Sequence, residues 1–149
     1  MIVLLRDAII DDLELILAWR SIPQLYIGSY TQFKKQRPLT WNEHWKWWNS
    51  RHNWKTFIIQ YNDGQWTRDI GYISWGQLDS WKPQVGVYNG EITLWGKGIG
   101  KQALSLAMDW LKGEGYIAAF TTILKNNERS IRLFKSLRWK RVGEGRDGE

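Results

Sequence analysis

The stretch 93-TLWGKGIGKQAL-104 decides how this chain of 149 residues folds. In it, Gly96, Gly98 and Gly100 come directly before residues spaced as in an amphipathic helix. Glycines at such a place allow tight turns and close approach of the backbone, and the first helical turn presents unpaired N–H groups at the positive end of the dipole. Phosphate is the natural ligand of such a loop, although a loop that only lets the helix pack would have the same composition.

Two familiar phosphate-binding motifs do not fit the spacing. A Walker loop needs a glycine where this chain has Trp95, and a serine or threonine where it has Gln102. A dinucleotide fingerprint could be placed on residues 98–103, but it requires an acidic residue about 20 positions further on. Residues 117–127 contain neither Asp nor Glu, so this second motif fits poorly.

Hydrophobic periodicity predicts a single domain, residues 1–149, of mixed α/β class. Strands are expected at residues 2–8, 54–61, 69–78, 84–89, 116–124 and 139–145, and helices at residues 11–21, 41–51, 100–113 and 127–137. Asn62, Asp63 and Gly64 between the second and third strands are typical of a β-hairpin. This order predicts a mixed sheet with helices on both faces.

The composition limits the possible partners. The formal net charge of +6 favours an anionic partner, which could be nucleic acid, a membrane surface or a phosphorylated small molecule. The twelve tryptophans would suit base stacking on single-stranded nucleic acid as well as a hydrophobic core. No apolar run approaches the roughly 18 residues of a membrane span. The absence of cysteine excludes disulfides and the usual zinc sites, so we expect a cytoplasmic protein without a metal.

Two motifs at a fixed separation resemble those of a known family. The stretch 94-LWGKGIGKQAL-104, followed one helix and one strand later by 126-NNERSIRLFKSLRWKRVG-143, is similar to the GNAT superfamily of acetyl-CoA-dependent N-acetyltransferases. Residues 5–21 resemble the opening strand and first helix of that family. The stretch 39-LTWNEHWKWW-48 resembles the second helix in the branches that acetylate ribosomal proteins and nucleotide-linked amino sugars.

The resemblance implies an α/β (α+β) GNAT fold. Its mostly antiparallel sheet of six to seven strands would have a V-shaped splay between the fourth and fifth strands. Acetyl-CoA is the implied cofactor, with the diphosphate of coenzyme A on backbone N–H groups of residues 97–101. The implied coenzyme A site consists of Val87, Tyr88 and Asn89 beside the thioester, of Trp95, Gly96, Lys97, Gly98, Ile99, Gly100 and Lys101 in the loop, and of Asn127 and Phe134 in the final helix. Taken alone, Asn127 would serve equally well as a plain helix cap.

Acetyl transfer to an amine requires a neutral amine, a polarised thioester carbonyl and a proton for the departing thiolate. Glu91 is the carboxylate nearest to the implied slot, although a solvated glutamate in a turn is the simpler interpretation. His44 occupies a position where the sugar-amine branch often has a histidine, so we expect it to contact the substrate. A surface histidine beside packed tryptophans is the alternative. Tyr88 is a third candidate catalytic residue.

Two positions depart from the family pattern. Phe134 stands where the family usually has the tyrosine that protonates the thiolate, and a phenyl ring has no proton to give. Tyr88, Tyr116, Ser130 or a water is expected to replace it. Thr122 stands where the members that acetylate ribosomal proteins place a glutamate base, which argues against that branch.

The acceptor is expected to enter beside the second helix. Lys34 and Arg37 belong to a basic run that would hold a phosphorylated or nucleotide-linked acceptor, unless this loop is merely solvated. Trp47 and Trp75 would join His44 in the wall of the acceptor cleft, where an aromatic face would stack on a sugar ring or a nucleobase. An aromatic stripe at helical spacing is nevertheless more often part of the core.

These observations predict an N-acetyltransferase in which a primary amine attacks acetyl-CoA directly. The expected acceptor is a small molecule such as a nucleotide-linked amino sugar, with a protein N-terminus or an aminoglycoside as alternatives. The competing classes are a non-catalytic acyl-CoA-binding protein and a nucleic-acid-binding module. We expect no membrane or nucleic-acid partner. The family normally adds a seventh strand after the turn that 143-GEGRDGE-149 begins. Without this strand one edge of the sheet would be bare, so we expect a homodimer in which the partner covers that edge.

Overall fold

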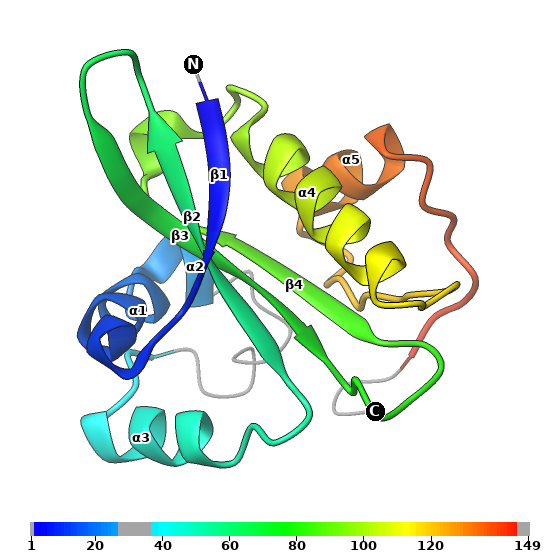
Figure 1. Ribbon diagram of the computed structural model, residues 1–149, viewed down its shortest axis with the longest axis horizontal. Helices are drawn as coiled ribbons and strands as arrows, with labels where there is room; N and C mark the ends of the chain where they lie inside the picture. The colour runs from blue at the N-terminus through cyan, green and yellow to red at the C-terminus, as the bar shows by residue number, and fades with distance from the viewer. Residues whose placement is uncertain (1, 27–36, 146–149) are drawn as a thin grey trace.

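A four-stranded antiparallel sheet forms the centre of the protein, as seen in a computed structural model that describes residues 2–26 and 37–145 (Figure 1). The strands lie in the order β1-β2-β3-β4. Their bounds are β1 Ile2–Asp7, β2 Lys55–Asn62, β3 Thr67–Gly76 and β4 Gln84–Asn89. Tyr72, in the middle of β3, pairs with Ile58 of β2 and with Tyr88 of β4.

Helices cover both faces of this sheet (Figure 1). One face carries α1 Leu13–Arg20, α2 Pro23–Tyr26 and α3 Trp41–Asn49, and the other carries α4 Ile99–Gly113 and α5 Glu128–Ser136. Two 3-10 turns, η1 Ile10–Asp12 and η2 Ile92–Leu94, precede α1 and the glycine loop. The prediction of a mixed fold with a mostly antiparallel sheet and helices on both faces is confirmed.

Local sequence signals explain where the helices of the site begin. The hydroxyl of Thr40 accepts a hydrogen bond from the amide of Glu43 (3.2 Å), and the Glu43 carboxylate accepts one from the amide of Thr40 (3.0 Å), which is the capping box expected before α3. The side chain of Asn127 accepts from the amide of Ser130 (3.2 Å) and so caps α5. Both caps were predicted.

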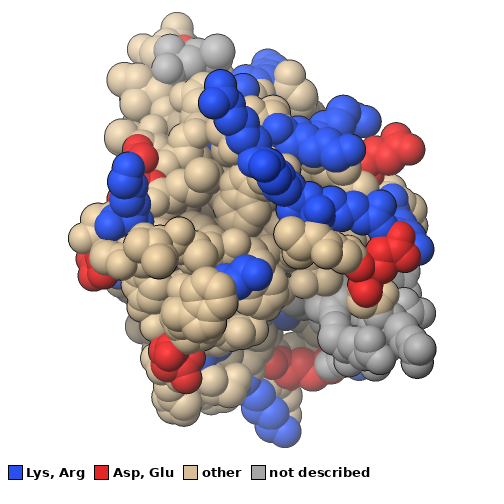
Figure 2. Space-filling view, turned by 90° about the vertical axis from the view of Figure 1, so that its right-hand side faces the viewer, with Lys and Arg blue, Asp and Glu red and all other residues tan. Residues whose placement is uncertain are grey.

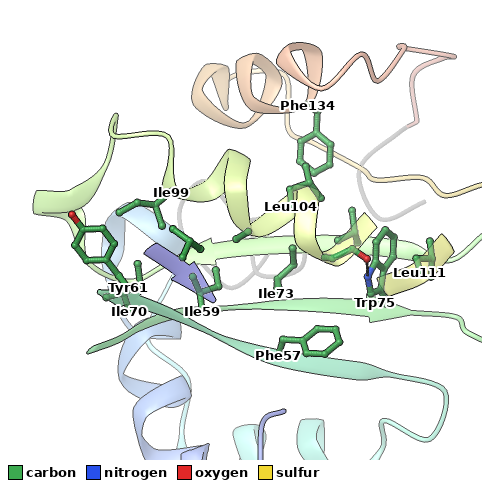
Figure 3. Packing of buried hydrophobic residues seen from close by; sticks show 14 of the residues in the cluster. Phe57, Ile59, Tyr61, Ile70, Ile73, Trp75, Ile99, Leu104, Leu111 and Phe134 are labelled. Atoms are coloured by element: carbon green, nitrogen blue, oxygen red, sulfur yellow. Dashed lines mark hydrogen bonds between the residues drawn. The ribbon is translucent and has the colours of Figure 1, made fainter. Parts of the chain in front are cut away.

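The larger hydrophobic core lies between the sheet and α4 (Figure 3). Ile59, Ile73 and Trp75 are completely buried there, and the indole N–H of Trp75 donates to the main-chain oxygen of Ala107 in α4 (3.2 Å). Figure 3 also shows Phe134 reaching from α5 toward this core. The core therefore fixes α4, and the loop that precedes it, against the sheet.

A second core lies on the opposite face of the sheet. Ile58 and Tyr72, which alternate with the residues of the first core, pack there against Ile16 and Trp19 of α1. The centre of the sheet is thus buried on both faces. The outer edge of β4 is one of the two sheet edges that no strand of the described residues covers.

The prediction of six to seven strands is wrong, because the described residues contain four. Residues 116–124 were expected to form a strand but make only an isolated parallel bridge, between Gln84 and Phe120. Beyond this bridge they separate from β4, so no hydrogen-bonded ladder forms. Residues 139–145, expected as the last strand, form no strand.

The described residues were also searched for two features that bear on partners. None of their helices has both the length and the apolar character that a bilayer crossing requires. Nor do His, Asp and Glu side chains of this part of the chain cluster in a way that could hold a metal ion.

Candidate functional site

A wedge-shaped cleft separates β4 from residues 121–124. The two segments are joined where the amide of Val85 donates to the oxygen of Phe120 (3.0 Å) and the amide of Phe120 donates to the oxygen of Pro83 (2.9 Å). Just beyond, the Thr121 hydroxyl donates to the oxygen of Val85 (2.8 Å). The segments then part around a cavity of about 110 Å³. This divergence agrees with the predicted splay.

Main-chain groups of β4 point alternately toward β3 and into the cleft. Gly86 and Tyr88 pair with β3, whereas Val85 directs its N–H and its oxygen the other way, to residues 120–121. By the same alternation, Val87 directs its N–H and its oxygen into the cleft, beyond the bridge. Val87 can therefore form backbone hydrogen bonds with an extended ligand that lies along β4.

The glycine loop at the start of α4 has free amide groups. Because α4 begins at Ile99 and the amide of Gln102 bonds to the oxygen of Gly98 (3.1 Å), the N–H groups of residues 99–101 have no partner in the helix. In the described part of the chain, the amide of Lys97 has no main-chain acceptor either. The loop can therefore bind an oxyanion, which agrees with the phosphate ligand that the sequence predicts.

Two glycines of the loop have backbone conformations that other residues rarely adopt. Gly96 and Gly98 have φ angles of 81° and 78°, in the left-handed region. A Cβ atom added at either residue would meet no heavy atom within 4 Å. The space beside the loop is thus open, so a ligand can approach this backbone closely.

Basic side chains surround this side of the molecule. Figure 2 shows lysine and arginine side chains gathered in a band across the face that carries α4 and α5 in Figure 1. Exposed basic residues of these two helices include Lys101, Lys112, Arg132 and Lys135. A positive band beside free amide groups increases the attraction for an anionic ligand.

Trp95 connects the end of β4 to α5. Its indole N–H donates to the oxygen of Asn89 (2.9 Å), and the guanidinium of Arg129 lies 3.3 Å from the centre of its ring. The side chain of Asn89 accepts from the amide of Glu91 (2.9 Å). The side chain of Glu91 is not among those that line the cleft, so this candidate base stands outside the cavity.

The start of α5 forms part of the cleft wall. Asn127, Ser130 and Phe134 line the cavity, and Phe134 also packs edge-on against Trp139 at 4.9 Å between ring centroids. Asn127 is thus both a helix cap and a residue of the cleft wall. The sequence had left open whether it is a cap or a contact of coenzyme A, and its position is compatible with both. The hydroxyl of Tyr116 donates to the oxygen of Leu78 (2.5 Å), away from the cleft. Of the hydroxyl groups named as replacements for the family tyrosine, Tyr88 and Ser130 lie in the wall.

Aromatic rings line the end of the cleft nearest to α1 and α3. Tyr88 stacks on Tyr72 with 4.5 Å between ring centroids, and Trp47 meets Tyr72 edge-on at 6.4 Å. Trp47 and Trp54 both line the cavity. Burial raises the pKa of the Tyr72 hydroxyl well above its ordinary value, so Tyr72 stays protonated. This end of the cleft therefore offers flat, neutral aromatic surfaces.

His44 lies behind the cleft wall. It is completely buried, and its Nδ1 accepts a hydrogen bond from the guanidinium of Arg20 (3.1 Å) because arginine can only donate. Its Nε2 then donates to the main-chain oxygen of Leu13 (2.7 Å). Burial lowers the pKa of His44 to about 4, and Arg20 and Arg51 act in the same direction. His44 is neutral at pH 7 and supports Arg20, which does line the cavity.

The other predicted substrate contacts have different positions. Trp75, expected in the wall of the cleft, instead lies fully buried in the core against α4, because it points to the face of β3 opposite Tyr72. Arg37 is exposed and forms an ion pair with Glu43 (2.9 Å). Lys34 lies outside the described residues. Among the described residues of this group, Trp47 lines the cavity and Arg37, His44 and Trp75 do not.

Sequence reasoning missed two arginines near the acceptor end. Arg20 lines the cavity from the last turn of α1, and its guanidinium lies 4.1 Å from the ring centre of Trp47. Arg51, just after α3, has its guanidinium 3.9 Å from the same ring. An arginine at the inward position of an amphipathic helix was the signal available for Arg20. For Arg51 the available signal was its position four residues after Trp47 and three residues before Trp54.

The chain belongs to the GNAT family of acetyltransferases, because the model of the acetyltransferase (GNAT) domain matches residues 3–140. An uncharacterized protein of Methanocaldococcus jannaschii is 42% identical over 147 residues, which is 99% of this chain and 30% of that protein. The chain thus spans less than a third of the length of this relative.

Solved structures have the same fold. The crystal structure of a domain from Methanocaldococcus jannaschii matches with a TM-score of 0.93 at 41% identity, covering 98% of this chain and 93% of that one. The spermidine N-acetyltransferase from Vibrio cholerae, crystallised with CoA and spermine, matches with a TM-score of 0.74 at 12% identity, covering 90% of this chain and 78% of that one. At this low identity the second match concerns the fold alone.

Proposed function

We propose that this protein is an acetyl-CoA-dependent N-acetyltransferase that transfers the acetyl group directly to a primary amine. The observation that carries the proposal is the cleft along β4. It contains the inward-facing main chain of Val87, and α5, which forms its facing wall, also lies beside the free amide groups at the start of α4, where Leu133 is 3.6 Å from a Cβ placed on Gly100. A long, anionic thioester needs both places at once: an oxyanion site at one end and backbone partners for an extended arm. Membership of the GNAT family supports this assignment.

The residues present fit coenzyme A. The amides of residues 97–101 would hold the diphosphate, since they have no main-chain acceptor among the described residues and the exposed Lys97 and Lys101 belong to the same loop. Val87 would pair with the pantetheine arm, and Asn127, in the facing wall, would contact the same arm. When bound, acetyl-CoA supplies the acetyl group as an activated thioester. The loop residues Gly96 and Gly98 serve the site by keeping its approach open.

The groups that would carry the chemistry lie in the middle of the cleft. The N–H of Val87 would polarise the thioester carbonyl, since a fixed donor of this kind stabilises the oxyanion of acyl transfer. We assign the hydroxyl of Tyr88 to proton transfer, with Ser130 as the alternative in the facing wall. Glu91 would accept the proton of the amine only through water, because its side chain does not line the cavity. His44 would act as a positioning residue for Arg20.

The acceptor that we propose is a small amine with a flat or cyclic body, such as a nucleotide-linked amino sugar. The supporting observation is the aromatic wall of Trp47, Trp54 and Tyr72, on which a sugar ring or a nucleobase can stack. A protein N-terminus and an aminoglycoside remain the alternatives, and the panel of amines below separates them.

The experiment that tests the proposal has two stages. Calorimetric titration with acetyl-CoA measures cofactor binding, and the release of free thiol is then followed with amino sugars, nucleotide-linked amino sugars, peptides with a free N-terminus and aminoglycosides. We expect binding together with steady-state thiol release for one of these classes. Absence of binding contradicts the proposal. Binding without any thiol release indicates a non-catalytic acyl-CoA-binding protein, for which the lack of a hydroxyl on Phe134 would be the reason.

Two further properties belong to the proposal. The homodimer expected from the bare sheet edge stays a prediction, and light scattering coupled to size-exclusion chromatography tests it: a monomeric mass contradicts it. Independence from nucleic acid is tested by titrating single-stranded DNA at low salt. Affinity that falls steeply with salt and does not respond to coenzyme A would favour the nucleic-acid-binding class instead.

A further inference from the structure

Arg51 has a buried charge without a hydrogen-bond partner. Its Nε, Nη1 and Nη2 atoms are inaccessible to solvent, and none of them bonds to any group in the part of the chain that the structure describes. Its guanidinium lies 3.9 Å from the ring centre of Trp47 and 4.3 Å from that of Trp54. Buried polar groups in proteins nearly always have partners, so this arginine requires an explanation.

The tryptophan rings account for only part of the environment of Arg51. A cation over an aromatic face gains electrostatic energy, but the five N–H donors of arginine lie in the plane of the guanidinium and point outward from it. Stacking therefore leaves these donors unused. A planar or tetrahedral oxyanion in the plane of the guanidinium would use two of them at once.

No carboxylate of the described residues is among the groups that act on Arg51. The groups that influence Arg51, besides its burial, are Arg20 and the hydroxyls of Tyr72 and Tyr88, and together they leave its pKa lowered to about 10. The arginine therefore stays charged at pH 7. Another cation near Arg51, Lys55, forms an ion pair with Asp7 at 2.8 Å. The guanidinium of Arg20 is a second positive group that acts on Arg51.

Arg51 lies where two hollows adjoin. Trp54 lines the cleft described above, and it also lines a second hollow of about 340 Å³ together with Arg51 and Trp48. Trp47 and Arg20 belong to the wall of the cleft. Trp47 and Trp54, the two rings that cover the guanidinium of Arg51, thus separate it from the aromatic end of the cleft, and an anion at that end reaches Arg51 when one of these indoles turns aside.

We infer that the acceptor amine carries an oxyanion, a carboxylate or a phosphate, which binds to the guanidinium of Arg51 between Trp47 and Trp54. The inference rests on the proposed function, because it concerns the acceptor end of the same cleft. It adds a requirement that the aromatic wall alone does not impose: among amines of similar shape, the negatively charged ones are preferred. Arg51 is a binding residue in this arrangement, and Arg20 stands beside the anion.

The test compares amines that differ in the anion alone. The pairs are glucosamine with glucosamine 6-phosphate and alaninamide with alanine, so the two arms also distinguish phosphate from carboxylate. We expect kcat/KM to be about tenfold or more higher for the anionic member of at least one pair, the size expected for a charge-assisted bond. Arg51→Gln should abolish this preference, and Arg51→Lys should retain part of it. Arg68→Gln, which removes an exposed arginine on β3, should leave it unchanged.

A binding measurement keeps this inference separate from the proposed function. Inorganic phosphate and acetate are titrated into the full chain saturated with coenzyme A, which occupies the loop amides, and tryptophan emission is followed. An anion that perturbs the emission of the unmodified protein and of Arg68→Gln, but not that of Arg51→Gln, supports the inference. If coenzyme A does not bind, the proposed function fails, and the same titration without it still tests Arg51.

Two outcomes overturn the inference. In the first, Arg51→Gln keeps the anion preference and the response to phosphate and acetate. In the second, both substitutions of Arg51 lower the thermal midpoint while neutral and anionic amines react equally well in the unmodified protein. The second result would mean that Arg51 only packs between the two tryptophans. Arg51→Lys serves as the informative variant if Arg51→Gln does not fold.

Discussion

Arg20 and His44 form a buried pair in which the arginine donates to Nδ1 of the imidazole over 3.1 Å. This bond fixes the histidine in its neutral form, with its proton on Nε2. The histidine is therefore unsuited to act as a base toward a substrate, and it holds the arginine at the cleft wall instead. The pair also gives the stability of the protein a defined dependence on pH.

We expect acid to destabilise the protein through His44. Its pKa is about 4 in the folded state, against 6.5 for a free histidine. Between these two values the unfolded chain binds a proton that the folded chain does not, so the free energy of unfolding falls as the pH drops from 6.5 to 4. Above pH 6.5 neutral His44 makes its full contribution to the free energy of unfolding. Below pH 4 this contribution of about 3 kcal/mol is lost.

Urea unfolding between pH 7 and pH 4.5 checks this dependence. His44→Gln should flatten the curve in that window relative to the unmodified protein. His52→Gln, which removes the exposed histidine, is the control and should keep the slope. An equal slope in His44→Gln and in the unmodified protein would show that another group is responsible.

Replacing Gly98 by valine should remove the affinity for coenzyme A. The Cβ would occupy the open space beside the loop, and the φ of 78° would strain the loop backbone. Gly115→Val is a matched control, because Gly115 has a φ of 95° and also has no heavy atom near its Cβ position. Each variant should lose about 1–2 kcal/mol of stability. Calorimetry should find affinity for coenzyme A reduced about 100-fold or more in Gly98→Val alone. Equal affinities in the two variants would refute the role of the loop.

Tyr88→Phe tests the proposed proton transfer. The substitution keeps the ring that stacks on Tyr72 and removes the hydroxyl, so kcat should fall about 100-fold while the affinity for coenzyme A is retained. Tyr116→Phe removes a hydroxyl that donates to Leu78, away from the cleft, and should cost about 1 kcal/mol of stability without changing kcat. An unchanged kcat in Tyr88→Phe would direct attention to Ser130→Ala.

Trp75 should matter for stability and not for the acceptor. Its side chain is completely buried against α4, so Trp75→Ala should lower the free energy of unfolding by about 4 kcal/mol. Trp66→Ala, at an exposed position 69% accessible to solvent, should change it by less than about 0.5 kcal/mol. For kinetics the milder Trp75→Phe is suitable. A raised KM for the acceptor, with an unchanged thermal midpoint, would place Trp75 in the cleft after all.

Local signals were enough to predict the free amides of the glycine loop, where we propose that the diphosphate binds. The glycines at 96, 98 and 100 and the apolar face of the following helix are read from neighbouring residues, and they place free amides at the start of α4 without knowledge of the rest. The caps at Thr40 and Asn127 are equally local. For the same reason the order of the helices and of the four paired strands followed from periodicity.

Features that depend on distant parts of the chain were not predicted correctly. Residues 116–124 have the apolar composition of a buried strand, but the composition does not say whether a partner strand runs alongside. Trp75 and Tyr72 lie on opposite faces of β3, and alternation separates them without saying which face meets the cleft. Arg51 packs between Trp47, four residues before it, and Trp54, three residues after it, and only the fold adds Arg20, Tyr72 and Tyr88 to its surroundings. Such residues become visible only once the fold brings their surroundings together.

The double attachment of Trp95 has a mechanical consequence. The bridge at Gln84 and Phe120 closes one end of the wedge, while the indole clamps the opposite end through Asn89 and Arg129. A cleft whose two walls are connected at both ends cannot open by a rigid-body movement of one wall. The dimensions of the slot are therefore largely set before any ligand arrives.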